Sequence, residues 1–282
     1  MTQSAVDTTT STQPTTEGSS KPNSQVWYCP PWSPEHGVYI VLLVSGLTGA
    51  AAAQSWTFSS TLALVCAFCG FQAEHPLVLQ LKQRRSLKPR FLVWGGLYSA
   101  VALAIAFWLY LNSPVLLWLY LGAIAALVVD TISVLQRKQK SIFNEIITFA
   151  AVCLSAPFAY AATTGTISAT AMGLWALNTL YFSSTIFTVK LRKPKTSSPV
   201  PGVVYHAIAS LIIATLYYLG WLSLVTALAF GLALLKFGII VLNREWYRTA
   251  KIQWVAMLET GTAFCFLTIV ALSLLPAHLS AL

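Results

Sequence analysis

Long apolar stretches, separated by short polar loops, follow one another along most of this chain. An α-helix of roughly twenty residues, rising about 1.5 Å per residue, crosses about 30 Å of hydrocarbon. Apolar residues make up 56% of the 282 and charged residues only 9%, whereas a soluble domain carries about 25% charge. None of the stretches alternates with the two-residue period of a membrane β-strand. The sequence therefore predicts an all-α polytopic transmembrane helical bundle.

About nine spans are expected, and they make 26–282 one integral membrane domain. In order, the expected spans are 34–55, 57–81, 91–112, 114–135, 142–162, 167–189, 203–219, 221–243 and 253–275. Because proline removes a backbone hydrogen bond, Pro76 is expected to kink the second helix and Pro157 to interrupt the fifth. Small residues at 45–53 permit another helix to approach closely. Residues 1–25, rich in Thr, Ser, Gln and Pro, predict a disordered tail.

The positive charges between the expected spans are confined to every second loop. They are Lys82, Arg84, Arg85, Lys88, Arg90, Arg137, Lys138, Lys140, Lys190, Arg192, Lys193, Lys195, Arg244, Arg248 and Lys251. Cytoplasmic loops of membrane proteins carry an excess of Lys and Arg. The pattern therefore predicts a cytoplasmic N-terminus, an external C-terminus and a multi-pass protein of the inner (plasma) membrane. It also accounts for the net charge of +9 without a nucleic-acid partner.

Two Glu-His pairs stand at the predicted cytoplasmic ends of the first two spans, and three further polar residues are expected opposite them. The pairs are Glu35 with His36 and Glu74 with His75, and the residues opposite are Asn144, Glu145 and His206. An acid beside an imidazole can hold its tautomer or raise its pKa at a working site. We therefore expect these side chains to line a polar pocket open to the cytoplasm. The alternative is structural, with Glu35 placed against the positive end of a helix dipole.

Two charged residues fall inside the expected spans. Lys236 lies within 221–243 and Glu259 within 253–275. An ionised side chain at the membrane centre costs about 2.5–3.5 kcal/mol on insertion scales, so each is expected to pair or to face a wet cavity. Three interpretations are open: a structural Lys236–Glu259 ion pair, a Lys236 side chain that reaches the membrane surface, and a functional pocket that both residues line.

The sequence identifies no cofactor and no metal site. The five cysteines are scattered, and the C-x-x-C formed by Cys66 and Cys69 has no His or further Cys at ligand spacing. We interpret these two residues as small packing groups within an apolar helix. No phosphate-binding glycine loop, serine-hydrolase elbow or zinc-protease helix is found in the sequence.

Two motifs resemble the YwiC-like family of bacterial membrane proteins. They are PEHGVY at 34–39 and HPLVLQLKQRR at 75–85. The family carries a P-x-H-G-aromatic start to its first helix and a Pro-Leu to Leu-Lys end to its second. The resemblance implies a membrane protein and assigns no activity to it.

The segment LSAPFAYAATTGTISATAMGLWAL at 154–177 is similar to the UbiA superfamily of intramembrane prenyltransferases. That resemblance implies a helical bundle with an isoprenoid ligand. Enzymes of this type hold Mg²⁺-diphosphate with two aspartate-rich motifs. These motifs follow the second and the sixth helix. In this chain Glu74 and His75 stand where the first motif would be, and the segment after the sixth expected span, VKLRKPKTSS, contains no acidic residue. The chain therefore lacks the oxygen ligands of a standard Mg-dependent prenyltransferase.

Several functions stay open at this point. The favoured expectation is a pocket that binds an isoprenoid or other amphipathic ligand, with the bilayer as partner and anionic lipid attracted by the basic loops. The first alternative is a small-solute or proton-coupled transporter in which Lys236, Glu259 and the histidines act as a relay. The others are a divergent prenyltransferase without the aspartate-rich motifs and an assembly or scaffold protein. The sequence does not decide whether the chain is an enzyme.

Overall fold

The computed structural model describes residues 30–32, 36–83, 87–138, 140–193 and 198–275. Within these ranges all regular structure is α-helical, as predicted. The predicted tail, 1–25, lies outside the described residues. The helices are α1 His36–Ala52, α2 Phe58–Lys82, α3 Pro89–Asn112, α4 Leu116–Leu135, α5 Ile142–Cys153, α6 Ser155–Thr164, α7 Ala169–Leu191, α8 Val200–Tyr218, α9 Leu224–Leu228, α10 Gly231–Leu242, α11 Arg244–Thr249 and α12 Ile252–Leu274.

Seven segments of the described chain are helical, long and apolar enough to cross a membrane. They are α2, α3, α4, α5 with α6, α8, α9 with α10, and α12. The apolar part of α1, Gly37–Ala52, is shorter. The prediction of a multi-pass helical membrane protein is therefore confirmed, and the helices begin and end within a few residues of the expected ranges.

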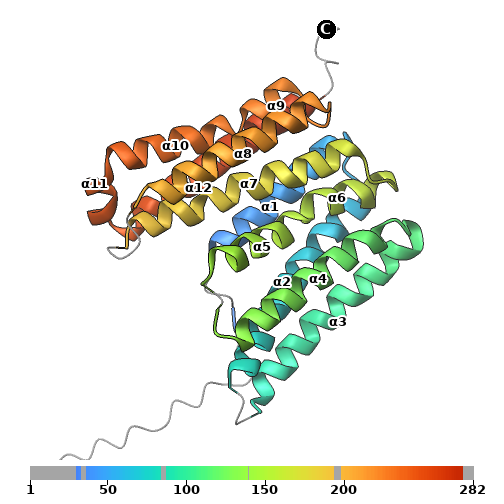
Figure 1. Ribbon diagram of the computed structural model, residues 1–282. Helices are drawn as coiled ribbons and strands as arrows, with labels where there is room; N and C mark the ends of the chain where they lie inside the picture. Colours follow the sequence, from blue (N-terminus) through green and yellow to red (C-terminus); the bar gives the residue numbers. More distant parts are fainter. Residues whose placement is uncertain (1–29, 33–35, 84–86, 139, 194–197, 276–282) are drawn as a thin grey trace, which may run out of the picture.

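The helix α7 corresponds to an expected span but is not among the seven, although it has 23 residues. It contacts α1, α5, α6, α8 and α10 and lies in the middle of the bundle (Figure 1). Its buried positions include polar ones: Asn178, Thr179, Ser183, Ser184 and Thr188. These side chains meet other helices rather than lipid. A helix enclosed by protein can therefore be less apolar than one that faces the bilayer.

Two expected spans are interrupted helices. Pro157 has no N–H to offer to the carbonyl group of Cys153, four residues earlier. The helix accordingly breaks there, because α5 ends at Cys153 and α6 begins at Ser155. The second break separates α9 from α10, which carries Lys236. By contrast, α2 runs through Pro76 without interruption.

Small residues let α1 and α6 approach each other closely, as the sequence predicts. A Cβ atom on Gly49 would lie 1.9 Å from the carbonyl oxygen of Ala156, so no larger residue fits without movement of a backbone. Across the same contact Ser155 Oγ donates a hydrogen bond to the Leu42 carbonyl oxygen at 3.1 Å. This contact fixes α1 against the first interrupted helix.

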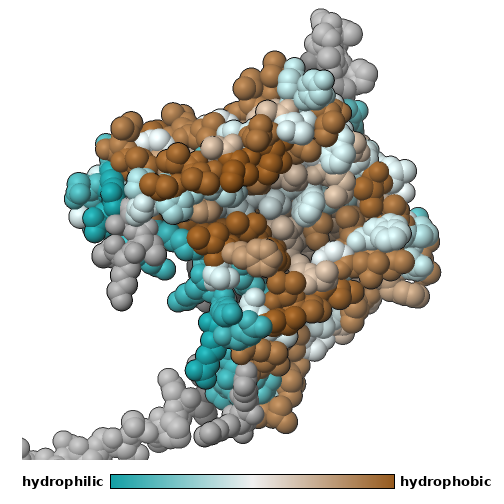
Figure 2. Space-filling view, viewed as in Figure 1, coloured by the Kyte–Doolittle hydropathy of each residue, from teal (hydrophilic) through white to brown (hydrophobic). Residues whose placement is uncertain are grey.

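The helices form two groups joined in the middle (Figure 1). The first contains α7, α8, α10 and α12, the second contains α2, α3 and α4, and α1, α5 and α6 lie between them. Most of the surface in Figure 2 is hydrophobic, while hydrophilic side chains gather where α4 ends, α5 begins and α11 lies. We call this the basic end. Its described Lys and Arg residues are Lys82, Lys88, Arg90, Arg137, Lys138, Lys140, Lys190, Arg192, Lys193, Arg244, Arg248 and Lys251.

Candidate functional site

The residues of the predicted polar mouth are only partly described. Glu35 lies outside the described residues, and His36 begins α1 but its side chain is not described. Glu74 and His75 are half-buried on α2, which packs along α3. The predicted partners Asn144 and Glu145 lie on α5, and His206 lies on α8.

Asn144 and Glu145 tie α5 to two different neighbours. Asn144 is 3% exposed, and its Nδ2 donates to Asp130 Oδ1 of α4 at 2.9 Å. Glu145 forms an ion pair with Lys190 near the end of α7. Ser141 caps α5 by accepting a hydrogen bond from the Asn144 backbone N–H at 3.2 Å. The start of α5 is therefore held from both sides.

His206 lies on α8 and faces α10. Its side chain is buried, with the residue 3% exposed, and the ring stacks on Phe237 with centroids 4.3 Å apart. Nδ1 lies 2.7 Å from the Gly202 carbonyl oxygen, which can only accept, so this nitrogen carries the proton. The other ring nitrogen, Nε2, has no hydrogen-bond partner among the described residues.

Three residues of the predicted pocket each contact a different helix. Asn144 faces α4, Glu145 faces α7 and His206 faces α10. A shared polar pocket for these residues stays a prediction.

Lys236 and Glu259 lie together within the membrane-spanning helices. Lys236 Nζ is 2.7 Å from Glu259 Oε2, and the two side chains are 1% and 21% exposed. Three helices bring polar atoms to this point, α7, α10 and α12. Lys236 and Glu259 each stand six or seven residues from the helix end at the basic end, which corresponds to a depth of roughly 10 Å at about 1.5 Å per residue.

Two threonines of α7 complete the contacts of this pair. Thr185 Oγ1 donates to Glu259 Oε2 at 3.0 Å and also lies 3.3 Å from Lys236 Nζ. Thr188 Oγ1 lies 3.4 Å from the other carboxylate oxygen, Oε1. We call Lys236, Glu259, Thr185 and Thr188 the buried charge cluster.

Aromatic rings border the buried charge cluster. The ammonium nitrogen of Lys236 lies 5.6 Å from the ring centroid of Tyr181, within the range of a cation–π contact. Tyr181 is fixed by a hydrogen bond from its hydroxyl to the Thr262 carbonyl oxygen at 2.8 Å and by stacking on Phe266 at 4.0 Å. The ammonium group therefore meets a rigid ring face rather than lipid.

Tyr247 of α11 borders the cluster toward the basic end. It is fully buried, and the Arg192 guanidinium lies 5.6 Å from its ring centroid. Burial raises the pKa of Tyr247 to about 12, and the charge of Glu259 acts in the same direction, while Thr188 and Arg192 oppose it. The phenol beside the cluster is therefore neutral at physiological pH.

The threonines and Tyr181 are functional candidates that sequence reasoning missed. The available signal was spacing, because Tyr181, Thr185 and Thr188 recur at the intervals that place residues on one helix face. That signal is weak in isolation, since α7 carries polar residues on several faces.

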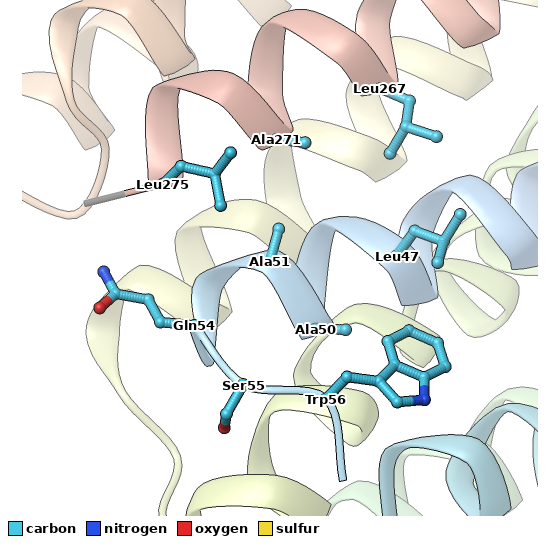
Figure 3. A pocket seen from close by; sticks show the side chains of 9 residues that line it. All are labelled: Leu47, Ala50, Ala51, Gln54, Ser55, Trp56, Leu267, Ala271 and Leu275. Atoms are coloured by element: carbon cyan, nitrogen blue, oxygen red, sulfur yellow. The ribbon is translucent and has the colours of Figure 1, made fainter. Parts of the chain in front are cut away.

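A pocket of about 400 Å³ lies at the end of the bundle opposite the basic end. It is lined by Leu47, Ala50, Ala51, Gln54, Ser55, Trp56, Leu267, Ala271 and Leu275. Figure 3 shows the α1 side chains facing those of α12, with Trp56 on the segment that leads to α2. Gln54 Nε2 donates to the Leu274 carbonyl oxygen at 3.4 Å beside it. This pocket contains none of the residues that the sequence nominated.

No group of three or more His, Cys, Asp or Glu side chains suited to a metal ion occurs in the ranges that the structure describes. The described cysteines, Cys66, Cys69, Cys153 and Cys265, are unpaired. The C-x-x-C pair lies in α2, where Cys66 Sγ donates to the Ala102 carbonyl oxygen of α3 at 3.3 Å.

Comparison with known proteins identifies a family over part of the chain. No curated protein matches the sequence, and no solved structure matches it. The likeness to UbiA prenyltransferases expected from 154–177 gains no support from these comparisons. The matching region holds both Glu-His pairs, Asn144 and Glu145, whereas His206 and the buried charge cluster lie beyond it. Over residues 32–160, less than half of its length, this multi-pass membrane protein matches the family described as YwiC-like protein.

Proposed function

We propose that this protein is a proton-coupled transporter of a small solute, in which the Lys236–Glu259 pair is the group that changes protonation. The observation that carries the proposal is the 2.7 Å contact between two charged side chains inside membrane-spanning helices. Ionisable residues at such depth are costly, and where they occur they are associated with ion and substrate pathways.

The unequal exposure of the two partners suits a switch. The Glu259 side chain is 21% exposed and that of Lys236 only 1%, so Glu259 is the partner that a proton can reach more easily. Protonation of Glu259 removes the charge that balances the ammonium group. An unpaired buried cation is strongly unfavourable, so Lys236 and the helix that carries it are driven to a new position.

Other titratable groups surround the pair, and their placement supports Glu259 as the proton acceptor. Tyr181 faces Lys236 from α7, and His206 of α8 stacks on Phe237, the residue that follows Lys236 on α10. Tyr247 and Arg192 lie on the side of the basic end. Tyr247 is neutral in the working pH range, and Glu259 is the carboxylic acid of this group.

The interrupted helices supply positions at which movement can occur. Lys236 lies on α10, which is separated from α9 by two residues. Transporters of known mechanism often place their sites on discontinuous helices. A short helix bounded by a break can tilt without disturbing the long helices α7 and α12.

The topology that accompanies this proposal has nine spans in the inner (plasma) membrane. Besides the seven apolar segments, α1 and α7 cross the bilayer, α7 within the protein interior. The basic end faces the cytoplasm because cytoplasmic loops are enriched in Lys and Arg. Glu259 then exchanges protons with the cytoplasmic side, and anionic lipid headgroups contact the basic residues there.

The test is proton movement in proteoliposomes that contain a pH-sensitive dye. Panels of amino acids, carboxylates, sugars and nucleosides are added outside, and a change in lumenal pH reports coupled uptake. We expect wild type to respond to at least one panel, and Glu259→Gln and Lys236→Met each to lose the response. The matched control is Glu245→Gln, which removes an exposed acidic side chain on α11. This variant should retain the response. A response that survives both cluster variants would contradict the proposal.

Binding of an isoprenoid or other amphipathic ligand is the second candidate, and the pocket in Figure 3 favours it. The pocket is mostly apolar, with Gln54, Ser55 and Trp56 where the chain leaves α1. An amphipathic molecule could place its chain between Ala51 and Ala271 and its polar group at Gln54. This position differs from the polar mouth formed by the two Glu-His pairs.

Mass spectrometry of small molecules that co-purify in mild detergent separates these two positions. Ala271→Phe fills the pocket, while Leu272→Phe changes the next residue, which is 64% exposed. Loss of a prenyl lipid or quinone in Ala271→Phe alone places the ligand in the pocket. Loss only in Glu74→Gln/His75→Ala places it at the polar mouth. Bulk phospholipid alone in wild type would remove this candidate.

A further inference from the structure

We infer that Glu259 and Thr185, with Thr188 beside the carboxylate, form a binding site (the seat) for an alkali cation, and that the ammonium group of Lys236 occupies this seat in the wild-type protein. The inference deepens the proposed transport function, on which it rests for its mechanistic meaning: it explains why the proton, and no metal cation, would be the coupling ion. The seat itself is a matter of geometry and can be examined without any transport assay.

Two oxygen atoms of the cluster lie beside the lysine nitrogen. Lys236 Nζ lies 2.7 Å from Glu259 Oε2 and 3.3 Å from Thr185 Oγ1. The Thr185 hydroxyl proton is directed to the carboxylate, so a lone pair of its oxygen is free to face the ammonium group. On a third side stands the ring face of Tyr181, 5.6 Å away. A carboxylate, a hydroxyl oxygen and an aromatic face are groups that bind a monovalent cation.

The rest of the cluster keeps this arrangement in place. Thr188 Oγ1 lies 3.4 Å from the second carboxylate oxygen. The Thr188 hydroxyl and the Thr185 carbonyl oxygen are 3.0 Å apart, which ties both threonines to one turn of α7. Tyr181 is held by Thr262 and Phe266. The oxygen atoms therefore stay close together when the ammonium group is removed.

The charge balance determines whether the Lys236 ammonium group or a free cation occupies the seat. The seat carries one negative charge, and Lys236 carries one positive charge on a tether that holds it within a few ångströms. A tethered group competes at an effective concentration far above that of a free ion. Sodium at about 100 mM is therefore excluded from wild type by mass action. Without the ammonium group, the half-buried carboxylate is expected to take up a proton or a cation because an uncompensated charge away from water is costly.

The size of the replacement residue discriminates between these outcomes. Lys236→Ala removes the charge and leaves room for a cation with a water molecule. Lys236→Met removes the same charge but fills the space with a side chain of similar length. The matched control for charge is Lys236→Ala/Glu259→Gln, which keeps the space and removes the acid. Lys236→Ser offers the same vacancy with an added hydroxyl oxygen and serves if the alanine variant does not purify.

The experiment measures thermal unfolding of the purified full chain at mildly alkaline pH in NaCl or KCl against N-methylglucamine chloride at equal ionic strength. Equilibrium binding of radioactive sodium to the same samples gives the stoichiometry. We expect Lys236→Ala, or Lys236→Ser, to be stabilised by one of the alkali cations and to bind about one per chain, at least about tenfold more tightly than wild type. Lys236→Met and the double variant should show no such preference.

Equal responses of Lys236→Ala and Lys236→Ala/Glu259→Gln would overturn the seat, as would sodium binding by wild type with the affinity of Lys236→Ala. These results are independent of the flux assay. Cation binding by Lys236→Ala without any transport by wild type leaves the seat standing and removes the transport function. Coupled transport by wild type without cation binding by Lys236→Ala would support the transport function and overturn the seat.

Discussion

Glu259 has three neighbours from two helices. These contacts determine how each substitution in the buried charge cluster changes the stability of the protein. Its carboxylate meets Lys236 and the hydroxyl groups of Thr185 and Thr188. Removing one charge of a buried pair leaves the other without compensation, whereas removing both leaves only polar groups that still find partners. The contribution of each residue therefore depends on whether its partner is present.

A double-mutant cycle is expected to reveal this coupling. Lys236→Met should lower the free energy of unfolding by about 3 kcal/mol, since breaking a buried pair costs about 3–5 kcal/mol and Glu259 is partly exposed. Lys236→Met/Glu259→Gln should recover a large part of that loss. The measurement is chemical unfolding in detergent micelles, with Glu245→Gln as the control for removing an acid elsewhere. Additive effects of the two single changes would show that the charges are not coupled.

The raised pKa of Tyr247 predicts that the free energy of unfolding falls at alkaline pH. Its pKa is raised from about 10 to about 12 by burial in the folded state. The folded state thus holds the phenol proton more tightly than the unfolded state. The resulting stability is fully present below about pH 10 and is lost as pH rises toward about 12.

Thermal unfolding between about pH 9 and about pH 12 tests this titration. We expect Tyr247→Phe to flatten part of the decline that wild type shows above about pH 10. Tyr218→Phe is the control, because Tyr218 is 88% exposed. Identical alkaline profiles for wild type and Tyr247→Phe would contradict the assignment.

At the scale of elements, the contact between α1 and the interrupted helix α5–α6 holds the two groups of helices together. It depends on Gly49, whose missing Cβ leaves room for the carbonyl group of Ala156. Ser45 and Ser155 add hydrogen bonds, to Cys153 Sγ at 3.4 Å and to the Leu42 carbonyl oxygen at 3.1 Å. Such small-residue contacts are the usual way in which membrane helices approach each other.

Replacement of one glycine should therefore separate α1 from α6. Gly49→Ala places a methyl group 1.9 Å from an oxygen atom, and we expect a loss of about 1–3 kcal/mol or more from this overpacking. Gly70→Ala on α2 is the control, since nothing lies within 4 Å of its Cβ position and alanine favours a helix by about 0.8–1 kcal/mol. Thermal unfolding in detergent compares the two. Equal stability of both variants would show that the contact has room to relax.

For the whole molecule, orientation in the bilayer follows from one asymmetry. All described Lys and Arg residues other than Lys236 lie at the basic end, while the apolar pocket lies at the other. From this asymmetry the positive-inside rule predicts a cytoplasmic basic end and an external pocket. The proposed proton entry and the proposed ligand position then face opposite compartments.

Accessibility of introduced cysteines tests this orientation. In a cysteine-free background, Lys138→Cys between α4 and α5 should react with an impermeant maleimide only after the cells are broken. Ser55→Cys at the pocket should react in intact cells, because the positive-inside rule places it outside. Each variant controls for the other. The reverse pattern would invert the bundle and with it the side from which Glu259 takes protons.

The sequence by itself determined the class of protein and the place of its helices. Runs of apolar residues, loop charges and prolines act locally, so the helical bundle and the interruption at Pro157 could be predicted before any contact was known. Depth in the membrane is also a property of sequence position. The sequence positions of Lys236 and Glu259 predict similar depths in the membrane for the two side chains, which is why their ion pair was one of the open interpretations.

Only the tertiary structure decided which polar groups meet. Sequence places Asn144, Glu145 and His206 near one end of the bundle, but the rotation of each helix about its axis decides what each one faces. That rotation follows from packing among distant segments, such as α1 on α6 at Gly49, which no local pattern encodes. Thr185 joined the charge cluster for the same reason. Helices are specified by short-range interactions, whereas the partners of their side chains are specified by the whole bundle.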